Sequence, residues 1–104
     1  MAAKYSDKKV ANMQIMQLVE KLRNIKEFTF KGETPDGNGG VNFQLSCDIN
    51  FFSWGEKIDI HMSPYGEQQT NIEIKSECAL PTQIIDMGKN KDNVNNIFRY
   101  LLES

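Results

Sequence analysis

Polar and apolar residues alternate along the middle of the chain. Every second residue from Val41 to Phe51 is apolar, and the residues between them are polar. Such a period of two is typical of a β-strand that is buried on one face and exposed on the other. The same alternation recurs over residues 57–62 and 70–78, and in a shorter form around residues 27–33. The pattern predicts four strands in an antiparallel sheet that is covered on one face.

Helical periodicity flanks these strands at both ends of the chain. Residues 6–26 are predicted to form a helix that Ser6 or Asp7 caps, and residues 90–104 a second helix with Asn90 or Asp92 as its cap. The apolar positions that support the two helices are Val10, Ile15, Leu18, Leu22 and Ile25, and Val94, Ile97, Phe98 and Leu101. The expected fold is a two-layer α+β domain spanning residues 1–104. Its order is α-β-β-β-β-α, with a four-stranded meander sheet and both helices on one face.

Composition and charge narrow the classes of function. The chain has 104 residues, of which 39% are hydrophobic and 25% charged, and it carries a formal net charge of −2. This acidic balance argues against sequence-independent binding of nucleic acid, which requires surplus lysine and arginine. No apolar run is long enough to span a membrane, and residues 1–13 lack the hydrophobic segment of a secretory signal. We therefore expect a cytoplasmic protein without a transmembrane segment.

The two cysteines are predicted to be reduced and buried. Cys47 and Cys78 both fall on the inward phase of their strands, and no metal-binding spacing surrounds them. They are expected at different levels of the sheet, too far apart for a disulfide. The sequence predicts no metal and no cofactor.

A cluster of aromatic residues precedes the second long strand. If Trp54 and Gly55 form a two-residue turn, Phe51 pairs with Ile58 and Cys47 with Met62, so that inward residues meet inward residues. Phe52 and Trp54 would then lie at the hairpin end. Two alternatives follow: the apolar segment 79–88 buries them, or they form an exposed patch for a protein partner or a lipid.

The single histidine lies on the predicted polar face of the sheet. His61 is flanked by Asp59 and is expected opposite Glu73, with Asp48 on the same face. A carboxylate–imidazole pair can perform acid–base chemistry. No serine or thiol nucleophile is in phase beside it, so an exposed structural pairing is favoured over catalysis.

The segment "DMGKNKDN", residues 86–93, contains a glycine–lysine pair just before a predicted helix. Backbone amides at such a position can hold an anion, which makes Lys89 a candidate binding residue. The full phosphate-binding pattern is missing, and so are the glycine and glutamate that a calcium loop requires. Helix capping, with Gly88 in a left-handed turn, is the favoured interpretation.

Three short segments, "SWGEK", "IKSE" and "DMGKNKDNVNNIF", together resemble a family of small bacterial α+β domains. In that family a strand that ends near a serine leads into an Asp-x-Gly-x-Asn-x-x-Asn helix start. The resemblance covers residues 41–102. It implies a bacterial origin and assigns no catalytic residue.

The sequence predicts a non-catalytic module that binds a ligand or a protein partner. The binding site would be the aromatic hairpin end with Phe52, Trp54 and Tyr65, or a cavity between helices and sheet that holds a small apolar ligand. The alternative is a structural protein, such as a homodimer, that pairs through an edge strand, expected to be the last strand. An enzyme that uses the polar face around His61 ranks last.

Overall fold

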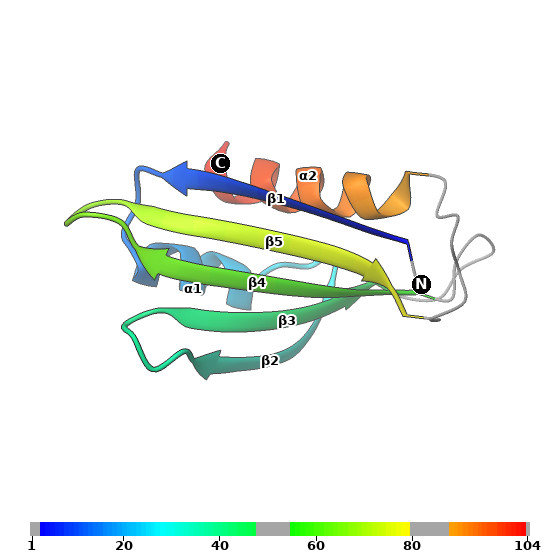
Figure 1. The fold of residues 1–104 in the computed structure, drawn as a ribbon, viewed down its shortest axis with the longest axis horizontal. Helices are drawn as coiled ribbons and strands as arrows, with labels where there is room; N and C mark the ends of the chain where they lie inside the picture. Colours follow the sequence, from blue (N-terminus) through cyan, green and yellow to red (C-terminus); the bar gives the residue numbers. More distant parts are fainter. Residues whose placement is uncertain (1–2, 48–54, 80–87, 104) are drawn as a thin grey trace.

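The computed structural model contains a five-stranded sheet and two helices (Figure 1). It describes residues 3–47, 55–79 and 88–103. The strands and helices, in chain order, are β1 (Lys4–Ala11), α1 (Ile15–Arg23), β2 (Thr29–Pro35), β3 (Val41–Cys47), β4 (Glu56–Pro64), β5 (Thr70–Cys78) and α2 (Lys89–Leu102). All neighbouring strands are antiparallel, and their order across the sheet is β1-β5-β4-β3-β2. The prediction of an α+β fold with an antiparallel sheet is confirmed.

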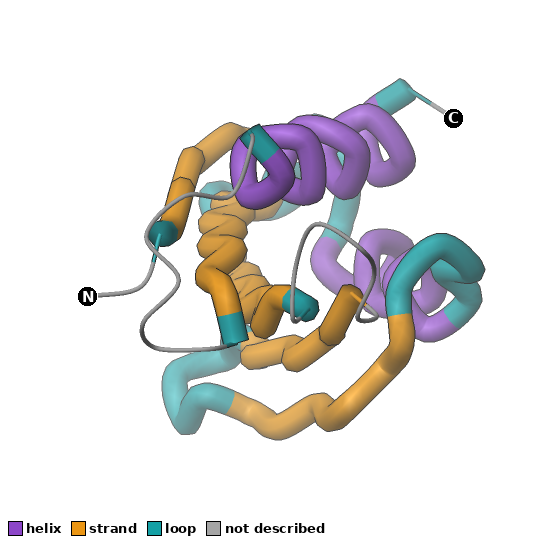
Figure 2. The backbone as a smooth tube through the Cα atoms, turned by 90° about the vertical axis from the view of Figure 1, so that its right-hand side faces the viewer, coloured by secondary structure: helices purple, strands orange, loops and turns teal. Residues whose placement is uncertain are grey.

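Both helices lie on the same face of a curved sheet (Figure 2). Burial alternates along β4 and β5, where the inward residues include Ile58, Ile60, Ile72 and Ile74. Helix α2 adds the predicted residues Val94, Ile97, Phe98 and Leu101 to this core, and α1 adds Leu18, Val19 and Leu22. Each fully buried leucine or isoleucine contributes about 1.5–3 kcal/mol. The opposite face of the sheet, which is turned toward the viewer in Figure 1, carries no helix of the described chain.

The prediction that the first helix begins at residue 6 was wrong. Residues 4–11 form strand β1, which pairs with β5 over its full length, from Lys4 opposite Glu77 to Ala11 opposite Thr70. Val10, which was assigned to the helix core, is 45% exposed. Helix α1 begins at Ile15, and the side chain of Gln17 accepts a hydrogen bond from the backbone N–H of Gln14. Pairing with β5 satisfies the backbone groups of every second residue of β1 and outweighs a weak local helical pattern.

The predicted turn at Trp54 and Gly55 was also wrong. Met62 pairs with Val41 instead of Cys47, a shift of six residues, and the last pair joins Cys47 to Glu56. Because the shift is even, every residue of β3 and β4 keeps its predicted face. Phe52 and Trp54 lie outside the described residues, as does Asp48.

The new register changes the expected positions of the cysteines. Glu56 is opposite Cys47 on one side and Cys78 on the other, so the two thiols lie at the same level of the sheet with β4 between them. Both are free cysteines, but only Cys78 is buried as predicted, whereas Cys47 is partly exposed. Two strand spacings of about 4.8 Å separate their backbones, which is too far for a disulfide.

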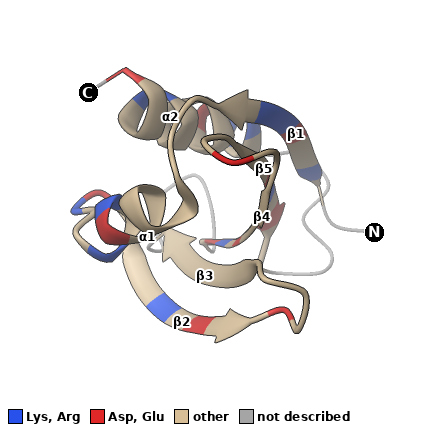
Figure 3. Cartoon of the chain, turned by 90° about the vertical axis from the view of Figure 1, so that its left-hand side faces the viewer, with Lys and Arg blue, Asp and Glu red and all other residues tan. Residues whose placement is uncertain are grey.

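The edges of the sheet are β1 and β2, and both carry charged side chains (Figure 3). The prediction that the last strand is an edge was therefore wrong, because β5 lies between β1 and β4. No helix in the described part of the chain is long and apolar enough to cross a membrane.

A buried group of polar side chains joins α2 to the sheet. The Ser76 hydroxyl donates to Asn90 Oδ1 at 2.8 Å, and Asn90 Nδ2 donates to the carbonyl oxygen of Ala3 at 2.9 Å. Asn93 Nδ2 donates to Glu56 Oε1 at 3.0 Å and to Ser76 Oγ at 3.2 Å. Asn90, predicted as a helix cap, is thus a buried side chain inside α2, and the N-cap is Gly88 in a left-handed conformation. These bonds define where α2 sits on three strands, because buried polar groups tolerate few alternative arrangements.

We predict that Asn90→Ala lowers the free energy of unfolding by about 1–3 kcal/mol, since it leaves buried partners without a hydrogen bond. Chemical denaturation measures this change. The matched control is Asn96→Ala on the exposed side of the same helix, for which we expect a change within about 0.5 kcal/mol. Equal effects of the two substitutions would contradict the structural role of Asn90.

Candidate functional site

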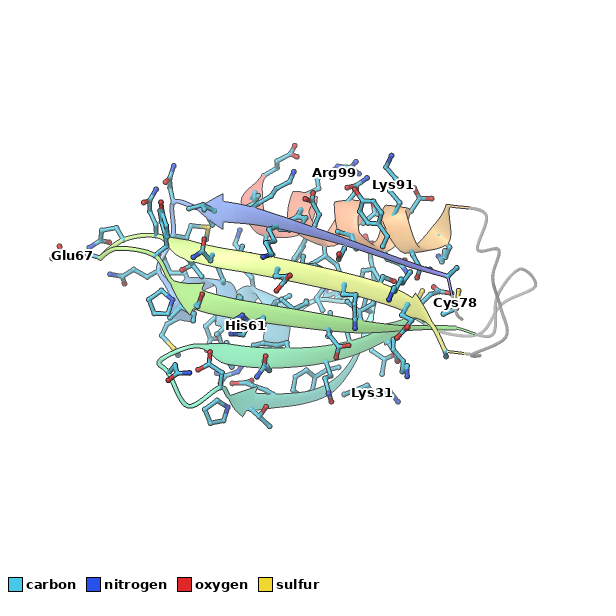
Figure 4. All side chains as sticks on the ribbon, in the orientation of Figure 1. Lys31, His61, Glu67, Cys78, Lys91 and Arg99 are labelled. Carbon is cyan, nitrogen blue, oxygen red and sulfur yellow. The ribbon has the colours of Figure 1, made fainter. Side chains whose placement is uncertain are left out.

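One side chain from each strand forms a continuous line across the open face of the sheet. The register places these five residues opposite one another, and we call them the His61 row: Thr34, Asn42, His61, Glu73 and Lys8. His61 lies near the middle of the sheet on β4 (Figure 4). A second line runs beside it and contains Gln44, Asp59, Lys75 and Ser6. Two shallow depressions of about 430 Å³ and 530 Å³ share His61 and Glu73 in their linings.

The hydrogen-bond partner of His61 comes from the loop between β2 and β3. His61 Nε2 lies 2.8 Å from Asp36 Oδ2. The other oxygen, Asp36 Oδ1, accepts the backbone N–H groups of Asn38 at 2.7 Å and Gly40 at 2.9 Å. A side chain at Gly40 would collide with the Asp36 carboxylate and the Met62 carbonyl oxygen. The loop is therefore shaped to hold this carboxylate against the histidine.

Electrostatics support an ionised Asp36. The hydrogen bond from His61 lowers the pKa of the Asp36 carboxyl group below its ordinary value, and the N–H groups of Asn38 and Gly40 lower it further. An ionised carboxylate can only accept hydrogen bonds, so His61 Nε2 must carry the proton that it donates. The pair consequently selects one tautomer of the neutral imidazole.

This tautomer leaves His61 Nδ1 available to a ligand. Nδ1 makes no hydrogen bond to any residue that the structure describes, and the side chain is 41% exposed. In neutral His61, Nδ1 is an acceptor, whereas in the protonated ring it becomes a donor. In the tautomer that Asp36 selects, this position on the open face can therefore recognise a hydrogen-bond donor.

The sequence identified His61 but not Asp36. Glu73 is opposite His61, as predicted, yet it pairs with Lys8, with 3.8 Å between Lys8 Nζ and Glu73 Oε2. Asp59 lies on the same face and is opposite Lys75 in the register. The signal for Asp36 was weak: an aspartate at the start of a glycine-rich loop, which is also typical of an ordinary turn.

The other predicted binding residues do not gather around one site. Tyr65 is 52% exposed and follows the last residue of β4. Lys89 is partly buried at the opposite end of β4, where its charge and that of Glu56 act on Cys47. Burial is the main cause that raises the pKa of the Cys47 thiol. The length of β4 thus separates Tyr65 from Lys89.

Metal binding finds no support in the described segments. Among residues 3–47, 55–79 and 88–103, no group of three histidine, cysteine, aspartate or glutamate side chains is arranged to hold an ion.

Comparison with known proteins adds no assignment. No family model and no curated protein matches the chain. The resemblance of residues 41–102 to small bacterial domains stays a prediction, and function has to be inferred from the site itself.

We predict that the pKa of Asp36 rises in a His61→Ala variant, which removes the side-chain donor, but stays below the ordinary aspartate value, because the Asn38 and Gly40 N–H groups remain. In the wild type, the pKa of Asp36 is lower in the folded than in the unfolded state. The ionised carboxylate therefore stabilises the fold at pH values above the unfolded-state pKa. That contribution is lost as the pH falls below about 4, through the folded pKa. An NMR titration of the Asp36 carboxyl carbon measures both values. Identical midpoints in the two proteins would contradict the Asp36–His61 hydrogen bond.

Proposed function

We propose that the protein is a non-catalytic binding module whose open sheet face contacts a polar ligand or the polar surface of a protein partner. The contact is centred on the His61 row. One observation carries this proposal: in the middle of a face that no described helix covers, Asp36 binds one imidazole nitrogen of the partly exposed His61 and leaves the other without a partner among the described residues.

Neutral hydrogen-bonding groups lie beside His61 on strand β3. The side-chain amides of Asn42 and Gln44 make no hydrogen bond to the described residues, and both are exposed beside His61 and Asp59. Amides offer donors and acceptors at once, which suits a partner rich in hydroxyl or amide groups. The β3 side of the face is therefore the part with the most groups available for recognition.

Most charged side chains of the face have a partner of opposite sign. Lys8 is opposite Glu73, Lys75 is opposite Asp59, and Glu77 lies between Lys57 and Lys4. Cross-strand pairs of opposite charge each stabilise a sheet by about 0.2–1 kcal/mol. Because lysines and carboxylates alternate across the described part of this face, it suits a partner of mixed or no charge better than nucleic acid.

One alternative has a specific observation in its favour. A histidine oriented by an aspartate is also the arrangement of a general base. A nucleophile or a water would have to lie at Nδ1, and the depression around His61 is shallow and polar instead of closed. Catalysis by His61 is therefore the second candidate, behind binding.

The test maps small polar probes on the surface by NMR. A library of neutral amides, polyols and zwitterionic amino acids is titrated into the ¹⁵N-labelled protein. We expect the largest shift changes in the amides of residues 42–44, 59–63 and 71–75, and we expect them to weaken in an Asn42→Ala, Gln44→Ala double variant.

Lys57→Ala, near the far end of the same face, is the matched control and is expected to leave probe binding unchanged. Probe binding that clusters on the helix side, or that is indifferent to Asn42 and Gln44, would contradict the proposed site. Turnover of an ester probe that disappears in His61→Gln would favour the catalytic alternative.

A further inference from the structure

Strand β1 is a regular edge with a free outer side. Its register with β5 runs without a bulge from Lys4 to Ala11, and the sheet ends at this strand within the described chain. The other edge, β2, is interrupted between Phe30 and Gly32 and ends at Pro35, which has no N–H to offer. Bulges, prolines and charged side chains, above all lysine, protect sheet edges. Of the two described edges, β2 has a bulge and a proline, whereas β1 has only its charged side chains.

The register shows which backbone groups of β1 face outward. The N–H of Cys78 donates to the carbonyl oxygen of Ala3, so Ala3 and every second residue after it bond to β5. The N–H and C=O groups of Lys4, Ser6, Lys8 and Val10 must then point away from the sheet. The N–H of Lys8 is bound by its neighbour Asp7, whose Oδ1 lies 2.8 Å away. A carboxylate oxygen occupies the position that the carbonyl of an added strand would take.

Depressions lie on both faces beside this edge. On the open face, Lys8 and Val10 line the depression of about 430 Å³. On the helix face, Lys9, Phe98 and Leu102 line a smaller one of about 210 Å³, where Lys9 Nζ lies 5.1 Å from the centre of the Phe98 ring. An added strand directs alternate side chains to opposite faces, so both depressions are within its reach.

The charge of β1 identifies the kind of partner. The strand has three lysines and one aspartate, and blue segments mark the lysines along it in Figure 3. The Lys8 side chain is 77% exposed and its pairing with Glu73 is long, at 3.8 Å. Such exposed lysines repel another basic strand and attract an acidic one.

We propose that β1 binds an extended acidic segment of a partner protein, which adds to the sheet as a sixth strand. The backbone of the segment pairs with the outward N–H and C=O groups of Ser6 and Val10 and with the C=O of Lys8. Its carboxylates lie beside Lys4 and Lys8. Lys8 and the depression of about 430 Å³ belong to both the His61 row and this edge. The inference differs from the proposed role of the row because it rests on the outward backbone groups of β1, which probe binding at Asn42 and Gln44 does not test.

The experiment uses a capped eight-residue peptide, as long as β1, that alternates glutamate and threonine. We expect a Kd below about 1 mM, with new hydrogen-exchange protection at the Ser6 and Val10 amides. A peptide with glutamine in place of glutamate should bind at least about tenfold more weakly, because it lacks charge. A peptide that is N-methylated on the nitrogens facing β1 should lose a similar factor, because it cannot donate backbone hydrogen bonds.

Protein variants test the same contacts from the other side. Asp7→Ala frees the Lys8 N–H and removes a repelling charge, so it should tighten binding by about threefold or more. Lys8→Gln should weaken binding, whereas Lys31→Gln on β2 is the matched control and should not change it.

Four results would overturn the proposal. They are the absence of binding at millimolar peptide, equal binding of the N-methylated peptide, protection that appears on β2 instead of β1, and concentration-dependent protection of β1 without peptide. The last result would assign the edge to a second copy of this chain. None of them bears on probe binding at the His61 row, so the two proposals fail independently.

Discussion

The structure depends on one constraint: both described helices cover the same face of the sheet. Side chains of a strand point alternately to its two faces, so one-sided cover requires an apolar residue at every second position and a polar residue between. β4 and β5 meet this requirement over nearly their whole length. The core and the polar face are two consequences of the same alternation. A residue that is excluded from the core is thereby placed on the open face, which is how His61 comes to lie beside Glu73 and Asn42.

Two clusters of polar side chains are more than an apolar core or a polar face requires, and their roles differ. The buried group around Asn90, Asn93 and Glu56 lies on the helix side, where it satisfies its hydrogen bonds within the protein. It specifies the position of α2 and offers no exposed atom. The Asp36–His61 pair lies on the open side, where the partly exposed imidazole keeps one nitrogen without a partner among the described residues. Polar groups that satisfy each other internally serve the fold, whereas an oriented group with an available atom is suited to recognition.

The sequence pattern predicted the features that follow from the alternation of polar and apolar residues. It missed the features that are set by tertiary contacts. The faces of β3, β4 and β5 followed from parity alone, and the level of Glu73 opposite His61 followed from parity together with the position of the short loop between β4 and β5. Strand β1 was missed because an edge strand is half exposed, and its lysines interrupt any clear alternation. The register of β3 with β4 was missed because parity cannot distinguish shifts by an even number of residues. The contact of Asp36 with His61 joins a loop to a strand that is distant in sequence, and no local pattern encodes it.

The central claim is that Asp36 orients His61 so that Nδ1 faces a ligand. Long-range ¹H–¹⁵N correlation spectra of the imidazole ring test it most directly, recorded at about pH 8, where an ordinary histidine is neutral. The structure predicts a single tautomer that is protonated at Nε2, with Nδ1 showing the shift of an unprotonated nitrogen. The Asp36→Ala variant should lose this preference. A wild-type ring that is protonated at Nδ1, or a mixture of tautomers that the variant leaves unchanged, would contradict the account.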